Sequence, residues 1–127
     1  MSKMVLDASA LLALLNAENG AEVVQDLLPE AAISTVNLAE VVTRLAAAGM
    51  PEDEIRGALS LLGLETLAFD EELAFLAGFL VLQTQPLGLS LGDQACLALA
   101  KATQASAVTA DRAWAGLDIG VEIRLIR

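Results

Sequence analysis

The fold is decided at Met4-Val5-Leu6-Asp7-Ala8-Ser9, where a short apolar run ends at a carboxylate and a helical pattern begins. Asp7 lies beside strongly apolar residues, and an unpaired charge in such surroundings is costly. Two interpretations of Asp7 are open. It caps the helix that follows, since Asp is a favoured helix N-cap, or it belongs to a functional site at the end of a strand.

Three more carboxylates stand at comparable transitions elsewhere in the chain. They are Glu40 in Asn37-Leu38-Ala39-Glu40, Asp93 in Ser90-Leu91-Gly92-Asp93, and Asp111 in Val108-Thr109-Ala110-Asp111. If the fold brings the four together, a cation must hold them, because like charges at close range do not all stay ionised alone. Oxygen ligands suit a hard ion such as Mg²⁺ or Mn²⁺. The pattern therefore predicts a metal site for phosphoryl chemistry.

The rest of the sequence alternates short apolar runs with helical stretches, which indicates a single α/β domain over residues 1–127 with a parallel sheet. Strands are predicted at 3–6, 31–34, 64–67, 107–109 and 121–126. Helices are predicted at 9–16, 20–28, 36–48, 52–62, 71–83 and 91–104, with a short one near 111–115. Because ligands bind outside the carboxyl ends of parallel strands, we expect Asp7, Asp93 and Asp111 to face one edge of the sheet.

The composition excludes several kinds of chemistry. The chain has no histidine, which excludes Ser-His-Asp hydrolysis and histidine-based ribonuclease mechanisms. Its one cysteine, Cys96, allows neither an internal disulfide nor a thiolate zinc site, and its apolar surroundings predict a core residue. No glycine-rich phosphate loop is present, so we expect no nucleotide cofactor.

The net charge of −10, with only seven basic residues, predicts weak intrinsic binding to RNA or a basic protein partner. The longest apolar run, 73–82, is too short to cross a bilayer. The N-terminus passes directly from Lys3 into the first strand with no signal-peptide pattern. We therefore expect a cytoplasmic protein with no membrane partner.

Glu40 is the carboxylate that capping explains least, because it is the fifth residue of its predicted helix and lies more than one turn past the start. Asn37, Glu40 and Arg44 share one face of this helix, and most of the other positions are apolar. A narrow polar stripe of this kind predicts a wet cleft inside the fold. The alternative is a solvent-facing ion pair between Glu40 and Arg44. For Asp93, the spacing from Ser90 also resembles a capping box.

Together these segments resemble the PIN domain family, and more closely the VapC toxins of bacterial and archaeal toxin–antitoxin pairs. The resemblance covers the whole chain, with no departure at the acidic positions, and its motifs are Val5-Leu6-Asp7-Ala8-Ser9, Asn37-x-x-Glu40, Leu89-Ser90-Leu91-Gly92-Asp93 and Thr109-x-Asp111-x-x-Trp114. It implies a three-layer sandwich with a central parallel five-stranded sheet, a divalent-metal ribonuclease acting on RNA, and inhibition by a cognate antitoxin.

The resemblance and the chemistry together assign roles to the four carboxylates. We expect Asp7 and Asp93 to bind Mg²⁺ or Mn²⁺ directly, and Glu40 and Asp111 to act through a second ion or through water.

Four further residues are expected to support the site. Ser9 and Thr109 orient carboxylates or the scissile phosphate, although local hydrogen bonding at a turn explains their hydroxyls equally well. Arg44 holds the substrate backbone or balances Glu40, and Asn37 shares the polar face with both.

Protein partners follow from the surplus of apolar residues on the helices predicted at 36–48 and 52–62. By the same resemblance, the chain forms a homodimer, and a groove beside this helix pair takes an apolar antitoxin segment. An arginine of the antitoxin would then enter the acidic mouth.

Other functions are open at this stage. The main alternative to an endoribonuclease toxin is a non-catalytic PIN-like interaction module whose acids are structural. A phosphatase with Asp7 as phosphoryl acceptor fits less well, because the haloacid dehalogenase type needs a second Asp where Ser9 stands.

Overall fold

Five short parallel strands form the sheet in the computed structural model, which describes residues 2–127. They are β1 (Met4–Leu6), β2 (Ala31–Ser34), β3 (Glu65–Leu67), β4 (Ser106–Thr109) and β5 (Ile123–Leu125), in the spatial order β3-β2-β1-β4-β5. Met4 is in register with Ala31 of β2 and with Ser106 of β4, so β1 is the central strand. The predicted α/β class and the parallel five-stranded sheet are confirmed.

Seven α-helices and three 3₁₀ helices connect the strands within the described residues. The α-helices are α1 (Ala8–Leu15), α2 (Ala21–Leu27), α3 (Thr35–Ala47), α4 (Glu52–Ser60), α5 (Glu71–Phe79), α6 (Val81–Thr84) and α7 (Leu91–Thr103). The 3₁₀ helices are η1 (Leu28–Glu30), η2 (Gln85–Leu87) and η3 (Arg112–Gly116). In this part of the chain no single helix is long and apolar enough to cross a membrane. One pair of helical segments, Glu71–Leu87 and Leu91–Thr103, is long and apolar enough when the two are taken together, but the pair is bent by 119°.

Two elements differ from the prediction in an informative way. The helix predicted at 71–83 is divided at Leu80, where the Thr84 hydroxyl donates to the Leu80 carbonyl at 2.9 Å, and such back-bonding bends helices. The strand predicted at 121–126 pairs only over Ile123–Leu125. It is an edge strand with β4 as its one neighbour, and β4 itself ends at Thr109, opposite Leu125.

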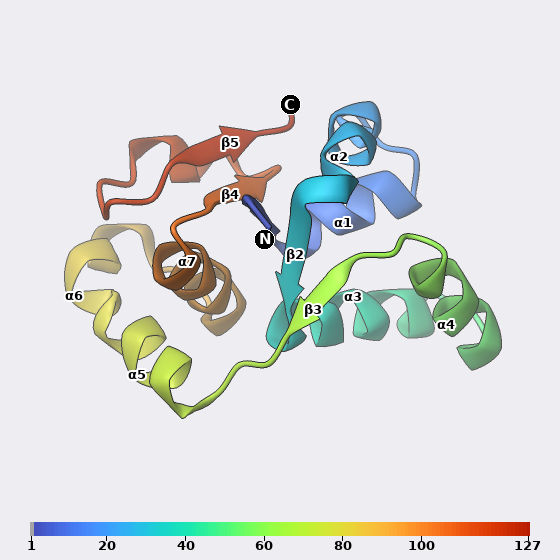
Figure 1. Ribbon diagram of the computed structural model, residues 1–127, viewed down its shortest axis with the longest axis horizontal. Coiled ribbons are helices and arrows are strands. Elements are labelled where there is room, and N and C mark those ends of the chain that lie inside the picture. The colour runs from blue at the N-terminus through green and yellow to red at the C-terminus, as the bar shows by residue number, and fades with distance from the viewer. Residues whose placement is uncertain (1) are drawn as a thin grey trace.

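Successive side chains of the central strands point to opposite faces of the sheet and pack in two separate hydrophobic clusters, because side chains alternate along a strand. Val5 and Ala107 pack in one cluster with residues of α5 and α7, whereas Leu6 and Val108 pack in another with α1 and α2. A third cluster joins Ile33 of β2 to α3 and α4. Figure 1 shows the resulting layers, with α5, α6 and α7 on one side of the sheet and α1 to α4 on the other.

This topology creates a crevice at the carboxyl ends of β1 and β4. From β1 the chain moves outward to β2 and β3, and it then returns to the other side of β1 to form β4 and β5. The crossover from β1 to β2 runs through α1 and α2, and the crossover from β3 to β4 runs through α5 to α7 on the opposite face. Loops that leave in opposite directions open a binding crevice at such a switch point.

Candidate metal centre

A hollow of about 620 Å³ lies at this switch point. Asp7 follows β1, Asp111 follows β4, Asp93 stands in the first turn of α7, and Glu40 projects from α3. All four carboxylates line the hollow, together with Ser9, Asn37 and Arg44. The fold thus brings four separate segments of the sequence to one place.

Asp7 is the most deeply buried of the four, with 5% of its surface exposed. Its Oδ1 accepts hydrogen bonds from the Ala10 amide at 2.8 Å and from the Ser9 hydroxyl at 2.7 Å. Its Oδ2 accepts from the Thr109 hydroxyl, which β4 supplies. Asp7 therefore caps α1 as one interpretation predicted, and the bond from Thr109 also fixes it to the neighbouring strand.

Burial raises the pKa of the Asp7 carboxyl above its ordinary value of 3.8, because loss of water disfavours the charged form. Hydrogen bonds from Thr109, Ser9 and Ala10 lower the pKa again in part, and the negative charge of Asp93 raises it. The ionised carboxylate is therefore held in place by donors but is short of positive charge. A cation in the hollow would supply that charge.

The supporting hydroxyls do more than bind Asp7. The Ser9 hydroxyl accepts from the Ala110 amide at 2.9 Å, and the Thr109 hydroxyl accepts from the Asp111 amide at 3.0 Å. The Ser9 bond ties the start of α1 to the segment that carries Asp111, and the Thr109 bond is local to that segment. Both hydroxyls also contact the Asp7 carboxylate, so Thr109 combines a bond to a carboxylate with a local backbone bond.

Asp93 and Asp111 also cap helices. Asp93 completes a capping box, with its Oδ2 accepting from the Ser90 amide and its own amide donating to the Ser90 hydroxyl, each at 3.1 Å. Asp111 Oδ1 accepts from the Ala113 amide at 3.0 Å, and Trp114, fully buried one turn later, anchors η3 in the core. In both carboxylates one oxygen makes the capping bond, and both residues line the hollow.

Glu40 is held differently, by the side chain of Asn37. The Asn37 amide nitrogen donates to Glu40 Oε1 at 2.8 Å and to the Gly92 carbonyl at 3.0 Å. The alternative of a Glu40–Arg44 ion pair does not form, since the three ion pairs found in residues 2–127 join other residues. Arg44 instead lines the hollow with no carboxylate partner among the described residues.

Cys96 lies in the core of the protein, as the sequence predicted. It is fully buried, and burial is the main reason that its pKa is raised well above the usual value. The charges of Asp7, Asp93 and Glu40 each raise the pKa further. A thiol that resists ionisation is a poor nucleophile. The full burial of Cys96 confirms the prediction of a core residue.

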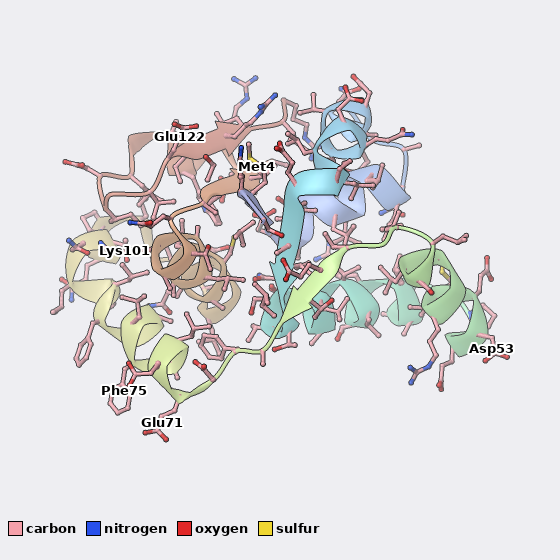
Figure 2. The ribbon with its side chains drawn as sticks, viewed as in Figure 1. Met4, Asp53, Glu71, Phe75, Lys101 and Glu122 are labelled. Carbon is pink, nitrogen blue, oxygen red and sulfur yellow. The ribbon has the colours of Figure 1, made fainter. Side chains whose placement is uncertain are left out.

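The remaining acids do not contribute to the hollow. Asp53 and Glu71 stand in the first turns of α4 and α5, where a negative charge is favourable beside the positive end of the helix. Figure 2 shows both side chains pointing away from the body of the molecule.

The donors of the hollow fit a hydrated Mg²⁺ or Mn²⁺. Within the described residues, no group of three or more Asp, Glu, His or Cys side chains is arranged to hold a metal ion. Mg²⁺, however, usually keeps several waters and binds through only one or two carboxylates. The carboxylates that line the hollow offer only oxygen ligands, and the buried Asp7 carboxylate has no cation beside it among the described residues. The buried Asn37 Oδ1 also has no hydrogen-bond partner in residues 2–127, so it could accept a bond from a water of the ion.

Gly92 is the residue of this site that the sequence did not reveal. It was part of the motif around Asp93, but no role was assigned to it. A side chain at this position would overlap the carboxylate of Glu40. The only signal in the sequence was a glycine in the first turn of a helix, where glycine is unfavourable.

Comparison with protein families identifies one match, the PIN domain, over residues 4–119. This range contains all four carboxylates. No curated protein matches the sequence.

Several solved structures have the same fold. The DNA-bound VapBC structure from Salmonella typhimurium superposes with a TM-score of 0.78 at 20% identity, over 100% of both chains. A toxin–antitoxin complex from Klebsiella pneumoniae superposes with a TM-score of 0.68 at 22% identity, over 94% of this chain and 99% of that chain. The VapBC-5 structure from Mycobacterium tuberculosis superposes with a TM-score of 0.61 at 24% identity, over 97% of this chain and 98% of that chain.

The raised pKa of Asp7 predicts a particular dependence of stability on pH. In the unfolded chain the Asp7 carboxyl loses its proton near its ordinary pKa of 3.8, whereas in the folded chain it loses the proton at a higher pH. The contribution of this group to the free energy of unfolding is therefore complete below pH 3.8 and is lost as the pH rises through the folded pKa. Asp7→Asn removes the ionisation and should flatten this part of the profile. Urea unfolding of the metal-free protein across the acidic range measures it, and an unchanged profile in the variant would contradict the assignment.

Proposed function

Because the chain belongs to the PIN domain family, we propose that it is a divalent-metal-dependent endoribonuclease and the toxin of a toxin–antitoxin pair. One observation carries the proposal: four carboxylates from four segments line a single hollow at the switch point of the sheet. The absence of histidine from the sequence leaves metal-assisted hydrolysis as the chemistry that these side chains fit best.

Each carboxylate has a proposed task. Asp7 and Asp93 hold Mg²⁺ or Mn²⁺, and Glu40 and Asp111 bind its water shell or a second ion. The ion, when bound, lowers the pKa of a water molecule and neutralises charge on the phosphate. Ser9 and Thr109 keep Asp7 in one orientation, so that the site is organised before substrate arrives.

The protein offers RNA few cations, which suits the proposed weak intrinsic affinity. Lys3, Arg56 and Arg127 already pair with carboxylates, and the Lys101 ammonium donates to the Ile119 carbonyl. Arg44 lines the hollow itself and is positioned to bind a phosphate of the substrate backbone.

The first prediction concerns metal dependence. RNA cleavage by the purified protein should require Mg²⁺ or Mn²⁺ and stop in EDTA. Loss of an outer partner of a metal ligand costs about tenfold to a hundredfold in activity, so Asp7→Asn and Asp93→Asn, which change proposed direct ligands, should each reduce kcat/KM by at least that much while the protein stays folded. Asp53→Asn, an exposed acid on α4, is the matched control and should cleave normally.

The same assay separates the proposal from its alternative. A non-catalytic interaction module would show no metal-dependent cleavage, and Asp7→Asn would change its stability alone. Cleavage that survives EDTA, or that is equal in the Asp7 variant and the wild type, would contradict the metal mechanism.

The proposed antitoxin site is an apolar groove of about 790 Å³ between α3 and α4. Two faces of α3 line different surface depressions. Asn37 and Glu40 line the acidic hollow, and Leu38 and Val42 line the groove. A segment seated in the groove lies one helix away from the carboxylates. A basic side chain at the end of that segment would therefore be attracted into the hollow.

We further propose that a second copy covers the exposed apolar side chains of α5 and α6. Phe75 and Phe79 stack at a centroid distance of 6.3 Å, and both are more than half exposed, as is Leu82. Figure 2 shows Phe75 pointing outward from α5. No charged residue occurs between Glu72 and Asp93, so this surface is neutral as well as apolar. Exposed patches of this kind mark protein interfaces.

The second prediction concerns assembly. Light scattering should give twice the chain mass of 13.2 kDa for the protein alone. A synthetic amphipathic helical peptide with an arginine near one end should bind and inhibit cleavage. Val42→Asp, inside the groove, should weaken the peptide and leave the dimer intact, whereas Leu61→Asp, at an 89% exposed position outside the groove, should change neither. A monomer, or equal peptide binding by both variants, would contradict these partners.

A further inference from the structure

Glu40 differs from the other three carboxylates of the hollow because it makes no helix cap. Asp7, Asp93 and Asp111 are each fixed by the backbone that they cap. Glu40 has a longer side chain and projects from the middle of α3, toward the first turn of α7. Something other than capping must therefore hold its carboxylate in one position.

Gly92 provides the space that the Glu40 carboxylate occupies. A β-carbon built on Gly92 would lie 2.6 Å from both Cδ and Oε2 of Glu40 and would overlap Oε1 more severely. Gly57 in α4 and Gly78 in α5 have no atom within 4 Å of the same position. Gly92 is therefore the helical glycine at which a missing side chain has a clear structural consequence.

Asn37 holds the same carboxylate from within α3. Only 1% of its surface is exposed, and its amide group donates to Glu40 Oε1 and to the Gly92 carbonyl. The two bonds join α3 to the first turn of α7. They fix Glu40 relative to the residue that immediately precedes Asp93.

We propose that Gly92 and Asn37 are positioning residues that form a socket for the Glu40 carboxylate. The socket holds Glu40 against the N-terminal turn of α7, where the helix favours a negative charge. It removes rotamer freedom from a flexible side chain before an ion or substrate binds, and so preorganises the site. The role of the socket in ion binding rests on the proposed metal-dependent function, whereas the socket itself does not.

The substitution Gly92→Ala tests the socket without threatening the fold. The added methyl group meets the far end of a flexible side chain, which can swing away, and alanine favours a helix more than glycine does. Gly57→Ala is the matched control, because it makes the same change in a helix with open space around it. Both variants should unfold cooperatively, with stability no lower than that of the wild type.

Two readouts separate displacement of Glu40 from a general effect. In the metal-free protein, the side-chain amide resonances of Asn37 should shift in Gly92→Ala and in Glu40→Ala but not in Gly57→Ala. Mn²⁺ affinity, measured by electron paramagnetic resonance, should fall about tenfold in Gly92→Ala, as expected when a ligand loses its orientation. In a Glu40→Ala background, Gly92→Ala should cause no further loss.

Either of two results would overturn the proposal. The first is a Gly92→Ala protein whose Asn37 resonances match the wild type. The second is a loss of Mn²⁺ affinity that persists in full when Glu40 is already absent. If the wild type neither binds Mn²⁺ nor cleaves RNA, the proposed function fails, and the amide resonances still decide whether the socket exists.

Discussion

The buried carboxylate of Asp7 joins the central strand to β4, because it accepts a hydrogen bond from the Thr109 hydroxyl at the end of that neighbouring strand. β1 is the central strand, and Asp7 ends it at the point where the sheet changes direction. The bonds from Ser9 and Thr109 join the start of α1 to the end of β4, and the amides of Ala110 and Asp111 extend the same network. These bonds hold the Asp7 carboxylate in one orientation where it lines the hollow.

Helix α3 connects the two surfaces that the protein presents. One face carries Asn37 and Glu40 into the acidic hollow, another carries Leu38 and Val42 into the apolar groove, and a third packs Val41 and Leu45 into the core. A partner bound in the groove would therefore lie one helix away from the carboxylates of the hollow. Under the proposed function, this geometry would let one short antitoxin segment bind the groove and send a basic side chain into the hollow.

Much of this arrangement was predictable from the sequence because the signals were local. The strands that end at Leu6 and Thr109 are short, and a carboxylate follows each of them within two residues. In a parallel sheet such positions share an edge, so the meeting of Asp7 with Asp111 required no knowledge of side-chain contacts. Capping was equally visible, and Asp7, Asp93 and Asp111 combine it with a place in the hollow.

The parts that were not predictable depend on contacts between distant segments. Glu40 has Asn37 on one side and Arg44 on the other, and the sequence does not say which it contacts. The position of α7 determines that Glu40 contacts Asn37, because the Gly92 carbonyl accepts a bond from the Asn37 amide and holds that amide beside Glu40. The division of the helix at Leu80 likewise depends on one hydroxyl bond from Thr84, which helical periodicity does not report.

The proposed function requires that the hollow bind a divalent cation through Asp7 and Asp93. Anomalous diffraction from crystals of the protein soaked in Mn²⁺ tests it most directly, because the signal locates the ion without reference to activity. A Mn²⁺ peak should appear in the hollow beside Asp7 and Asp93, and no peak should appear there in crystals of Asp7→Asn. A wild-type crystal with Mn²⁺ bound only at the exposed acids of α4 or α5, or the same peak in the variant, would contradict it.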